Sequence, residues 1–215
     1  MDSIITHDLK RYRASSDGTP EGVDETIDYQ VDGLYDLLEP YKGQILGVGH
    51  GNHEDEIVKR CATNPSKRLA EKLGCPYLGL NYFFVLVFRE NGARGRSVVI
   101  RGHHGWGGGS RTRGGSITKY SHDTGYYDAD IFLYGHDHKL QFDEIPRISI
   151  AGDKLIQKPK TMCLCGSFKK TMVDSPDCTW EESKGFPPVV IGGLDITIKP
   201  QNNWVEVTVD KRSYY

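Results

Sequence analysis

Apolar residues recur with helical spacing early in the chain, between Asp24 and Leu38. They are spaced by four, three and four positions, and they are Ile27, Val31, Leu34 and Leu38. This spacing places all of them on one face of an α-helix, which predicts an amphipathic helix over residues 24–38. Pro40 is expected to end it, because proline cannot continue the helical hydrogen bonding.

A second helix is predicted to begin at Asn64-Pro65-Ser66 and to end at Gly74. Asparagine is a favoured N-cap residue, and proline is common in the first helical turn. Glycine is the usual residue just beyond the last turn. Between these signals the apolar positions Leu69, Ala70 and Leu73 would form the buried face.

Short apolar runs separated by turn residues predict β-strands in the rest of the chain. Residues 44–48 are bounded by glycines and are expected to form a strand that is buried on both faces. Residues 82–88 and 97–101 are expected to pair as a hairpin around the turn at 91–95. Further strands are predicted at 129–134, 147–150, 161–164, 189–191, 194–198 and 204–209, with a turn at 201–203, a helix near 117–124 and an irregular start over 1–21.

The order of these elements indicates the fold class. Helices alternate with strands early and strands predominate late, which is typical of an α/β sandwich built on two sheets. The 215 residues fit a single domain, residues 1–215, with a substantial core.

Composition narrows the functional classes. A net charge of −2 gives no overall electrostatic reason to expect nucleic-acid binding. No apolar run approaches the roughly 18 residues needed to span a bilayer, and the N-terminus lacks the basic start of a signal peptide. We therefore expect a cytoplasmic protein without membrane association. The five cysteines lack paired spacing, so they are interpreted as buried free thiols rather than disulfides or a zinc ribbon.

Six of the eight histidines lie in three segments that each follow a predicted strand. Imidazole nitrogens with amide or carboxylate oxygens suit Mn, Fe, Zn or Co, and loops at strand ends can gather distant ligands at one sheet edge. Two such ions about 3.5 to 4 Å apart can clamp a phosphate ester and lower the pKa of a bound water. A neighbouring histidine could then protonate the departing alkoxide.

Three motifs stand in order in these segments: Gly51-Asn52-His53-Glu54, His104-Gly105 and Gly135-His136-Asp137-His138. They resemble the calcineurin-like metallophosphoesterase superfamily, and the loop after His104 is also similar to that of phage and mobile-element members. The resemblance implies a calcineurin-like four-layer sandwich of two mixed β-sheets flanked by helices. It also implies hydrolysis of a phosphomonoester or phosphodiester by metal-activated water, with two divalent ions from Mn, Fe, Zn or Ni, of which Mn is favoured.

The resemblance assigns a role to each residue of the first motif. It implies that Asn52 binds one metal and also the phosphate. His53 would act as the general acid for the leaving group, and Glu54 would orient His53.

The later motifs would supply the remaining ligands. The resemblance makes His104 and His136 ligands of the same metal as Asn52, and His138 a ligand of the other metal. His103 could replace His104, although the family's histidine directly precedes a small residue, which favours His104. Asp137 is interpreted as a turn residue.

The chain departs from the family at its start. The superfamily begins with a D-x-H motif on its first strand and a GD-x-x-D or GD-x-x-N motif on its second. Neither is complete here, although Asp2 could end the second motif, which predicts an N-terminally truncated domain. His7-Asp8 has the reverse order and is not accepted as a substitute. Without the bridging carboxylate the first ion would keep His138 alone, whereas the second would keep Asn52, His104 and His136. The chain is therefore either a truncated enzyme or a remnant that binds one ion weakly.

Two alternative functions therefore stay open: a non-catalytic metal-binding or interaction protein, and a metal-dependent nuclease. The nuclease would require Arg111 and Arg113, in the glycine-rich stretch 107–115, to line a groove. Ordinary turn chemistry explains that stretch about as well as a phosphate cradle does. Of the other residues with functional potential, Arg101 is expected in a structural ion pair and Trp106 in simple packing. The histidines outside the motifs are expected at the surface or behind the site, and they are His7, His50 and His122.

Overall fold

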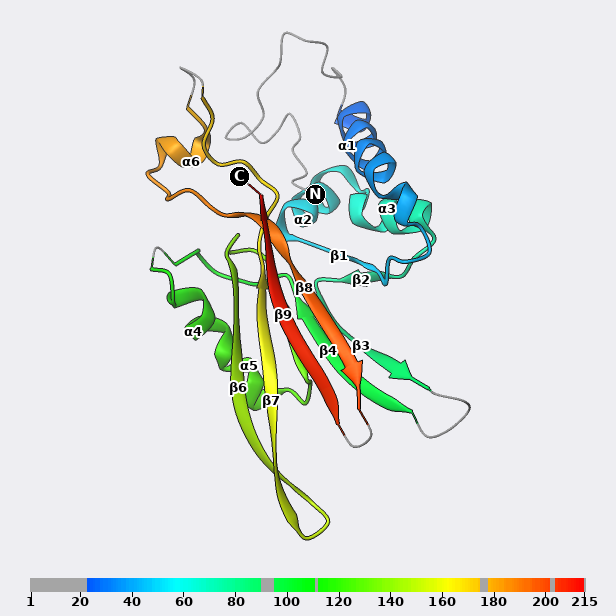
Figure 1. Cartoon of the computed structure of the whole chain (residues 1–215). Coiled ribbons are helices and arrows are strands. Elements are labelled where there is room, and N and C mark those ends of the chain that lie inside the picture. The colour runs from blue at the N-terminus through cyan, green and yellow to red at the C-terminus, as the bar shows by residue number, and fades with distance from the viewer. Residues whose placement is uncertain (1–22, 90–94, 111, 175–177, 202–203, 215) are drawn as a thin grey trace. The chain divides into compact units, whose positions relative to one another are not determined.

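The computed structural model describes residues 23–89, 95–110, 112–174, 178–201 and 204–214. The chain forms two compact units, Met1–Asn81 and Tyr82–Tyr215 (Figure 1). The predicted irregular start, Asp2, His7 and most of the two predicted turns lie outside the described residues. Across the described part of the chain, no helix is both long and apolar enough to cross a membrane.

The first unit contains helices and two short strands. The helices pack around a core of Ile27, Val31, Ile57, Leu69 and Leu73. Its elements are α1 (Val23–Leu38), the 3-10 helix η1 (Glu39–Tyr41), β1 (Val48–Gly49), α2 (Asn52–Cys61), α3 (Pro65–Leu73) and β2 (Tyr77–Gly79), with β1 and β2 parallel.

Both helices predicted in this unit from spacing and caps are confirmed. On α1 the stripe positions Ile27 and Val31 are fully buried, and the helix gives way at Glu39 to η1, which contains Pro40. On α3 the side chain of Asn64 accepts a hydrogen bond from the backbone N–H of Lys67 at 2.9 Å. Gly74 ends α3 with a φ of +67°, the left-handed conformation that favours glycine.

The strand predicted over residues 44–48 differs from the structure. Strand β1 contains only Val48 and Gly49, and β2 is its one described partner. Leu46 precedes the strand and is 59% exposed, so this apolar run is not buried on both faces. An apolar run can predict a buried strand only when other elements cover both of its sides, and here the described residues of the unit cover one.

The second unit is built on a five-stranded sheet with the strand order β3-β4-β5-β7-β6. The β4–β5 and β5–β7 pairs are parallel and the β6–β7 pair is antiparallel, so the sheet is mixed. Strands β8 and β9 form a separate antiparallel hairpin. The bounds are β3 (Asn81–Phe88), β4 (Arg96–His103), α4 (Gly115–Ser121), α5 (Asp123–Tyr126), β5 (Ile131–Tyr134), β6 (Leu140–Ala151), β7 (Lys154–Cys165), α6 (Trp180–Ser183), β8 (Ile191–Pro200) and β9 (Val205–Tyr214).

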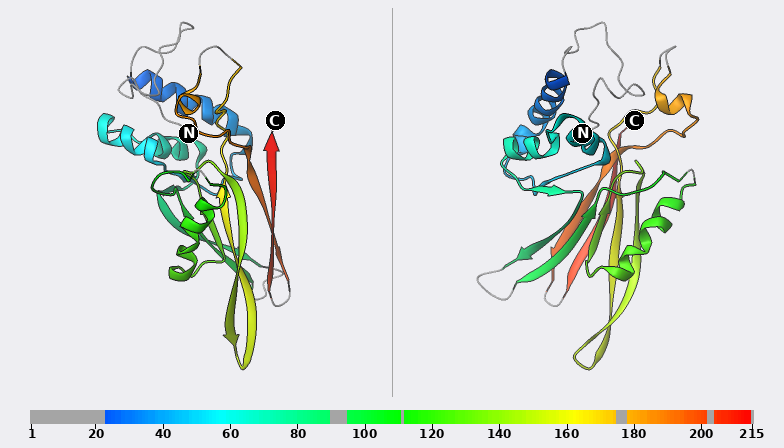
Figure 2. Two further views of the ribbon diagram at one scale, coloured as in Figure 1. Left: turned by 90° about the vertical axis from the view of Figure 1, so that its left-hand side faces the viewer. Right: turned by 180° about the vertical axis from the view of Figure 1, so that it is seen from behind.

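Apolar clusters lie on both faces of the five-stranded sheet. On one face Tyr120 and Ile117 of α4 pack with Phe132 and Met162 of the sheet. On the other face residues of β8 and β9 pack against Val98, Ile100 and Ile131. Figure 2 shows the green helices and the orange and red hairpin on these opposite sides.

The predicted α/β class, with packed sheets flanked by helices, is confirmed. The second sheet of this unit is an antiparallel hairpin rather than a mixed sheet. The strands predicted at 147–150 and 161–164 are the C-terminal parts of the two strands of a long hairpin, β6–β7, whose polar positions hid its true length. The strand predicted at 189–191 only begins β8, at Ile191.

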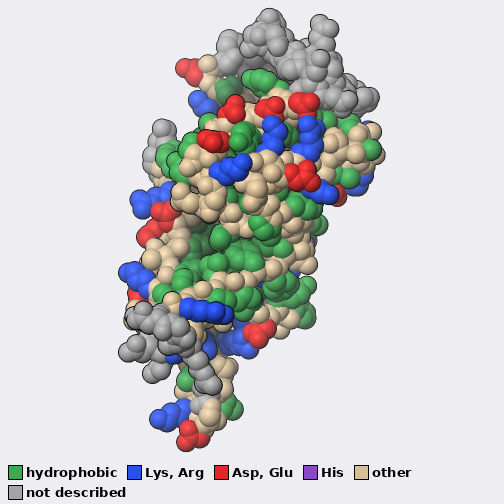
Figure 3. Space-filling view, turned by 90° about the vertical axis from the view of Figure 1, so that its right-hand side faces the viewer, with side chains coloured by type: hydrophobic (Ala, Val, Ile, Leu, Met, Phe, Trp, Pro, Cys, Tyr) green, Lys and Arg blue, Asp and Glu red, His purple; other side chains and the backbone are tan. Residues whose placement is uncertain are grey.

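Strand β3 is an edge strand with apolar side chains on both faces. Phe84, Leu86 and Phe88 pack toward the β8–β9 hairpin. Their neighbours Phe83, Val85 and Val87 point the other way and are about half exposed. Figure 3 shows hydrophobic side chains gathered on this side of the molecule. Helices α4 and α5 therefore leave the end strand of the sheet uncovered.

Candidate functional site

The first histidine motif lies in the first unit, where β1 meets α2. Gly51 is the N-cap of α2, so Asn52 and His53 are its first two residues. The backbone N–H of Gly51 donates to Oε2 of Glu54 at 3.1 Å, and Glu54 is almost completely buried. Asn52 is exposed and His53 is half-buried. The buried carboxylate thus fixes the first turn of the helix that carries Asn52 and His53; its predicted effect on His53 stays a prediction.

His50 is buried rather than exposed, which corrects one of the two placements expected for it. Its Nε2 atom lies 3.0 Å from Oδ1 of Asp55, and its ring meets Tyr77 edge-on at 5.9 Å. This contact connects the end of β1 to the first turns of α2. The position of His50 directly after an apolar run was the available signal for burial.

The other two motifs lie in the second unit, where strands β4 and β5 of the five-stranded sheet end. His103 and Tyr134 end the neighbouring parallel strands β4 and β5 and lie opposite each other in the strand register. The residues that follow therefore leave the sheet side by side. His104 Nε2 and His136 Nδ1 are 3.2 Å apart, with ring centroids 5.1 Å apart and planes at 77°.

This distance fits two ligands of a single metal ion. Imidazole nitrogens bound about 2.0 to 2.1 Å from one ion, at angles of roughly 90 to 110°, are separated by about 3.0 to 3.4 Å. The His104–His136 distance falls in that interval. Within the described ranges, no three His, Cys, Asp or Glu side chains are gathered closely enough to hold an ion. The second unit therefore supplies two well-placed donors rather than a complete ligand set.

The third motif is a tight turn with an unusual backbone. His136 and His138 have φ values of +67° and +54°, a region that residues other than glycine rarely adopt. Between them, the backbone N–H of Asp137 donates to the carbonyl of Gly135 at 2.8 Å. Such strain persists where surrounding contacts enforce it, and it is concentrated at functional sites.

Asp137 supplies those contacts. Its side chain is buried, and Oδ1 accepts hydrogen bonds from Lys119 Nζ at 2.9 Å and from Tyr120 Oη at 3.3 Å. Asp137 is thus a turn residue, as expected, and it also fastens the turn to α4. No motif in the sequence marked Lys119 or Tyr120 for this role.

His103 makes contacts other than those of the histidine pair. Its Nδ1 atom accepts a hydrogen bond from the backbone N–H of Gly105 at 2.8 Å, and its ring meets Trp106 edge-on at 5.0 Å. Burial and the nearby Arg101 guanidinium hold the pKa of His103 below its usual value. This placement favours His104 over His103 as the ligand, and the ligand assignment itself stays a prediction.

A buried polar network supports the two loops from behind. Arg101 is 2% exposed, and its Nη1 lies 2.9 Å from Oδ2 of Asp123 and 3.0 Å from Tyr134 Oη. Tyr134 donates to the same carboxylate oxygen at 2.6 Å, and burial raises the pKa of Tyr134. The ring of Trp106 meets Tyr120 edge-on at 4.9 Å. The structural ion pair predicted for Arg101 and the packing predicted for Trp106 are both confirmed.

Lysines hold the glycine-rich stretch through its carbonyl groups. Lys119 Nζ donates to the carbonyl of Trp106 at 2.9 Å, and Lys139 Nζ donates to that of Ser110 at 2.7 Å. His136 Nε2 lies 2.5 Å from the carbonyl of Gly107. Arg111 lies outside the described residues, and Arg113 is exposed. In its described part, the stretch is therefore an anchored loop.

Comparisons with known proteins give little support for a family assignment. No protein-family model matches the chain, and no curated protein matches it. The crystal structure of zinc-complexed Vps29 from Entamoeba histolytica is 14% identical, covers 94% of this chain and 93% of its own, and has a TM-score of 0.35. A conserved predicted phosphoesterase from Streptococcus pneumoniae is 16% identical, covers 86% and 91%, and has a TM-score of 0.33. With TM-scores this low, neither likeness supports a conclusion about this chain.

The resemblance to a family therefore rests on this chain's own residues. The three motifs follow strands β1, β4 and β5 in the expected order, and the second unit places two of their histidines side by side. The fold is α/β, with packed sheets flanked by helices. In its three motifs, this chain is similar to the calcineurin-like metallophosphoesterases.

Proposed function

We propose that this chain is a metal-dependent phosphoesterase that hydrolyses a phosphomonoester or phosphodiester. The observation that carries the proposal is the 3.2 Å separation of His104 Nε2 and His136 Nδ1 at the edge of the sheet. The two donors lie in the loops that follow β4 and β5, and these loops are held by a strained turn and a buried network. Such a preorganised pair is what a metal centre needs.

The ligands follow from this pair and from the resemblance. His104 and His136 would hold one divalent ion with Asn52, and His138 would serve a second ion. Mn is the favoured metal, with Fe, Zn or Ni as the other candidates. When bound, such ions supply Lewis-acid polarisation of the phosphoryl oxygens and lower the pKa of the attacking water.

The remaining steps belong to side chains of the first motif. Asn52 would also bind and orient the phosphate through its amide group. His53, half-buried on the first turn of α2, would donate its proton to the departing oxygen. Glu54 fixes that turn through the Gly51 N–H and would thereby position His53.

A second candidate is a non-catalytic metal-binding or interaction protein with this fold. One observation favours it: the His136 ring is already within hydrogen-bond distance of His104 on one side and of the Gly107 carbonyl on the other. In this role the histidine pair would fasten two loops together. The chain would then bind an ion weakly without turning over a phosphate ester.

Hydrolysis of bis-p-nitrophenyl phosphate and p-nitrophenyl phosphate with Mn²⁺ tests the proposal. We expect turnover that falls about 10²- to 10⁴-fold in His53→Ala, because a general acid is lost. His136→Ala should abolish turnover by removing a ligand. His122→Ala is the matched control, since His122 is exposed and outside every motif.

Three outcomes separate the candidates. Turnover that is unchanged in both His53→Ala and His136→Ala would contradict the site assignment. Mn²⁺ binding that depends on His136, without any hydrolysis, would support the non-catalytic candidate. Degradation of an oligonucleotide that weakens with added salt would instead indicate a nuclease.

A further inference from the structure

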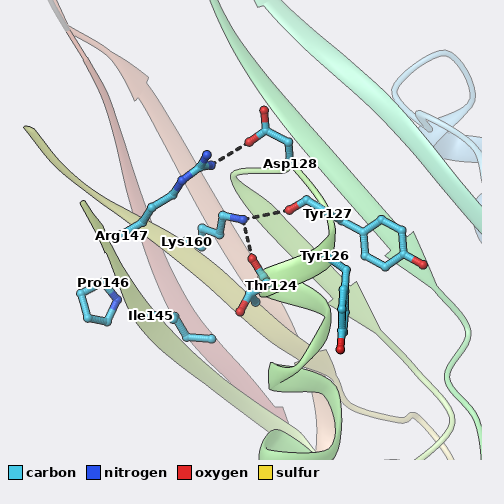
Figure 4. Close-up of a pocket in the computed structure, with 9 residues that line it drawn as sticks. Thr124, Tyr126, Tyr127, Asp128, Ile145, Pro146, Arg147 and Lys160 are labelled. Atoms are coloured by element: carbon cyan, nitrogen blue, oxygen red, sulfur yellow. Dashed lines mark hydrogen bonds and ion pairs between the residues drawn. The ribbon is translucent and has the colours of Figure 1, made fainter. Parts of the chain in front are cut away.

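A cavity of about 430 Å³ lies in the second unit, between the end of α5 and the long β6–β7 hairpin. Its polar lining comes mainly from Thr124, Asp128, Arg147 and Lys160 (Figure 4). A second hollow of about 270 Å³ shares Asp128, Arg147 and Lys160, and it adds Lys158. The cavity adjoins residues that precede β5, whereas His136 follows β5. It therefore lies at the opposite end of that strand from the histidine pair.

Lys160 is the unusual residue of this cavity, because it is only 7% exposed. Its Nζ donates to the carbonyl of Thr124 at 2.6 Å and to the carbonyl of Tyr127 at 2.8 Å. An ammonium group has three N–H donors, so the described residues provide acceptors for two of them. A buried ammonium with an incomplete set of acceptors favours an additional acceptor in the adjoining space.

Positive charge is concentrated on the same wall. Arg147 on β6 and Lys158 on β7 are directly opposite each other in the strand register, and like charges in such pairs are destabilising. Burial, followed by the positive charge of Arg147, holds the pKa of Lys160 below its usual value. The cationic groups on this wall thus repel one another, and an anion between them would relieve that repulsion.

The nearby carboxylates do not fully balance this charge. Asp128 pairs with Arg147 at 2.7 Å, and the Asp128 side chain is 88% exposed. Asp130 accepts a hydrogen bond from the Val99 N–H at 2.9 Å. Arginine has five N–H donors, so Arg147 keeps donors for a second acceptor while it pairs with Asp128. Three cations against two carboxylates leave a net positive charge, and the N–H groups of Lys160 and Arg147 suit an oxyanion such as phosphate.

We propose that this cavity binds a phosphate group, with Lys160 and Arg147 as its principal donors. The cavity is larger than phosphate alone, so the ligand is either inorganic phosphate or the phosphate end of a small metabolite. The site is separate from the His104–His136 pair, and the proposal does not depend on the proposed hydrolysis.

Calorimetric titration of the full chain with inorganic phosphate, in buffer containing EDTA, tests this site. We expect millimolar or tighter binding that weakens about tenfold or more in Arg147→Gln, because a charge-assisted hydrogen bond is lost. Arg212→Gln is the matched control: Arg212 forms an exposed pair with Asp195 on the β8–β9 hairpin of the same unit. The affinity of the Arg212→Gln chain for phosphate should equal that of the unchanged chain.

Lys160→Met should also abolish binding, although it removes the contacts to Thr124 and Tyr127 and will lower stability. Arg147→Gln keeps the proposal testable, since Arg147 is about half exposed. Amide NMR shifts on phosphate addition should be concentrated at residues 124–128 and around Lys160.

Phosphate affinity that is equal in Arg147→Gln and the unchanged chain overturns the proposal, as does the absence of binding. Binding of citrate without binding of phosphate also overturns it, by showing a carboxylate site. A sugar phosphate that binds more tightly than inorganic phosphate would identify the metabolite source.

Discussion

Gly105 is the residue on which the packing of the two histidine loops depends most directly. Its φ is +109°, and a Cβ atom there would lie 2.6 Å from His136 Cβ and 2.6 Å from Tyr120 Oη. Real Cβ atoms do not approach other atoms so closely. The loops after β4 and β5 can therefore lie this near each other only because this side chain is absent.

We predict that Gly105→Ala lowers the free energy of unfolding by about 2 to 4 kcal/mol, from backbone strain and overpacking together. Urea unfolding measures this change. Gly108→Ala is the control, because a Cβ at Gly108 meets nothing within 4 Å. Equal stability of the two variants would show that the loops do not pack as described.

Arg101 illustrates how a charged residue becomes essential to a core. Its guanidinium is paired with Asp123 and lies 4.0 Å from the centre of the Tyr127 ring. Removal of one partner leaves the other charge buried and uncompensated. We predict that Arg101→Met costs about 3 to 5 kcal/mol in urea unfolding.

The exposed pair of Arg212 with Asp195 provides the comparison for that prediction. Both side chains are at least half exposed, so Arg212→Met should change stability by about 1 kcal/mol or less. A cost for Arg101→Met no greater than that for Arg212→Met would contradict the buried network.

At the scale of elements, local signals predicted helices well and strand extents poorly. The caps and spacing of α3 were all readable, since each is a property of residues within a few positions of one another. The β6–β7 hairpin has twelve residues in each strand, and only short apolar parts of it were predicted. Partner strands rather than apolar runs determine how far a ladder extends.

We predict that Asn64→Ala lowers the free energy of unfolding by about 1 kcal/mol, because the backbone N–H of Lys67 loses its acceptor. Asn64→Asp keeps a side-chain oxygen acceptor at the cap and should cost less. Asn64 also donates to Tyr77 Oη at 3.1 Å. The alanine variant loses this contact, whereas the aspartate carboxylate can accept a hydrogen bond from the Tyr77 hydroxyl. An equal cost for both variants would contradict the contribution of an oxygen acceptor at the cap.

At the scale of the whole molecule, the chain contains two units with separate apolar cores. The motif that carries Asn52 and His53 belongs to one unit, and the His104–His136 pair belongs to the other. A measurement on the whole chain is therefore the appropriate test of whether these residues serve the same ion, as the resemblance implies.

We predict that Mn²⁺ stabilises the whole chain against heat, because a ligand that binds only the folded state shifts the equilibrium. The gain is about 2.7 kcal/mol at one hundred times the Kd. His104→Ala should abolish the shift in Tm and Asn52→Ala should reduce it, whereas His122→Ala should leave it unchanged. An unchanged shift in Asn52→Ala would remove Asn52 from the proposed ligands of that ion.

The sequence by itself determined the features that depend on neighbouring residues. These are the stripes and caps of α1 and α3, the α/β class, and the positions of three histidine motifs at strand ends. Short-range spacing encodes the stripes and caps, because helical periodicity and capping act within a few residues. The α/β class follows from the order of the elements that this spacing marks.

Only the tertiary structure decided which side chains meet. It brought His104 to within 3.2 Å of His136, fastened Asp137 to Lys119, and placed Lys160 beside Arg147 in a cavity. Each of these contacts joins residues brought together by strand order and helix packing, which depend on the whole of each unit. For that reason no local pattern in the sequence could specify them.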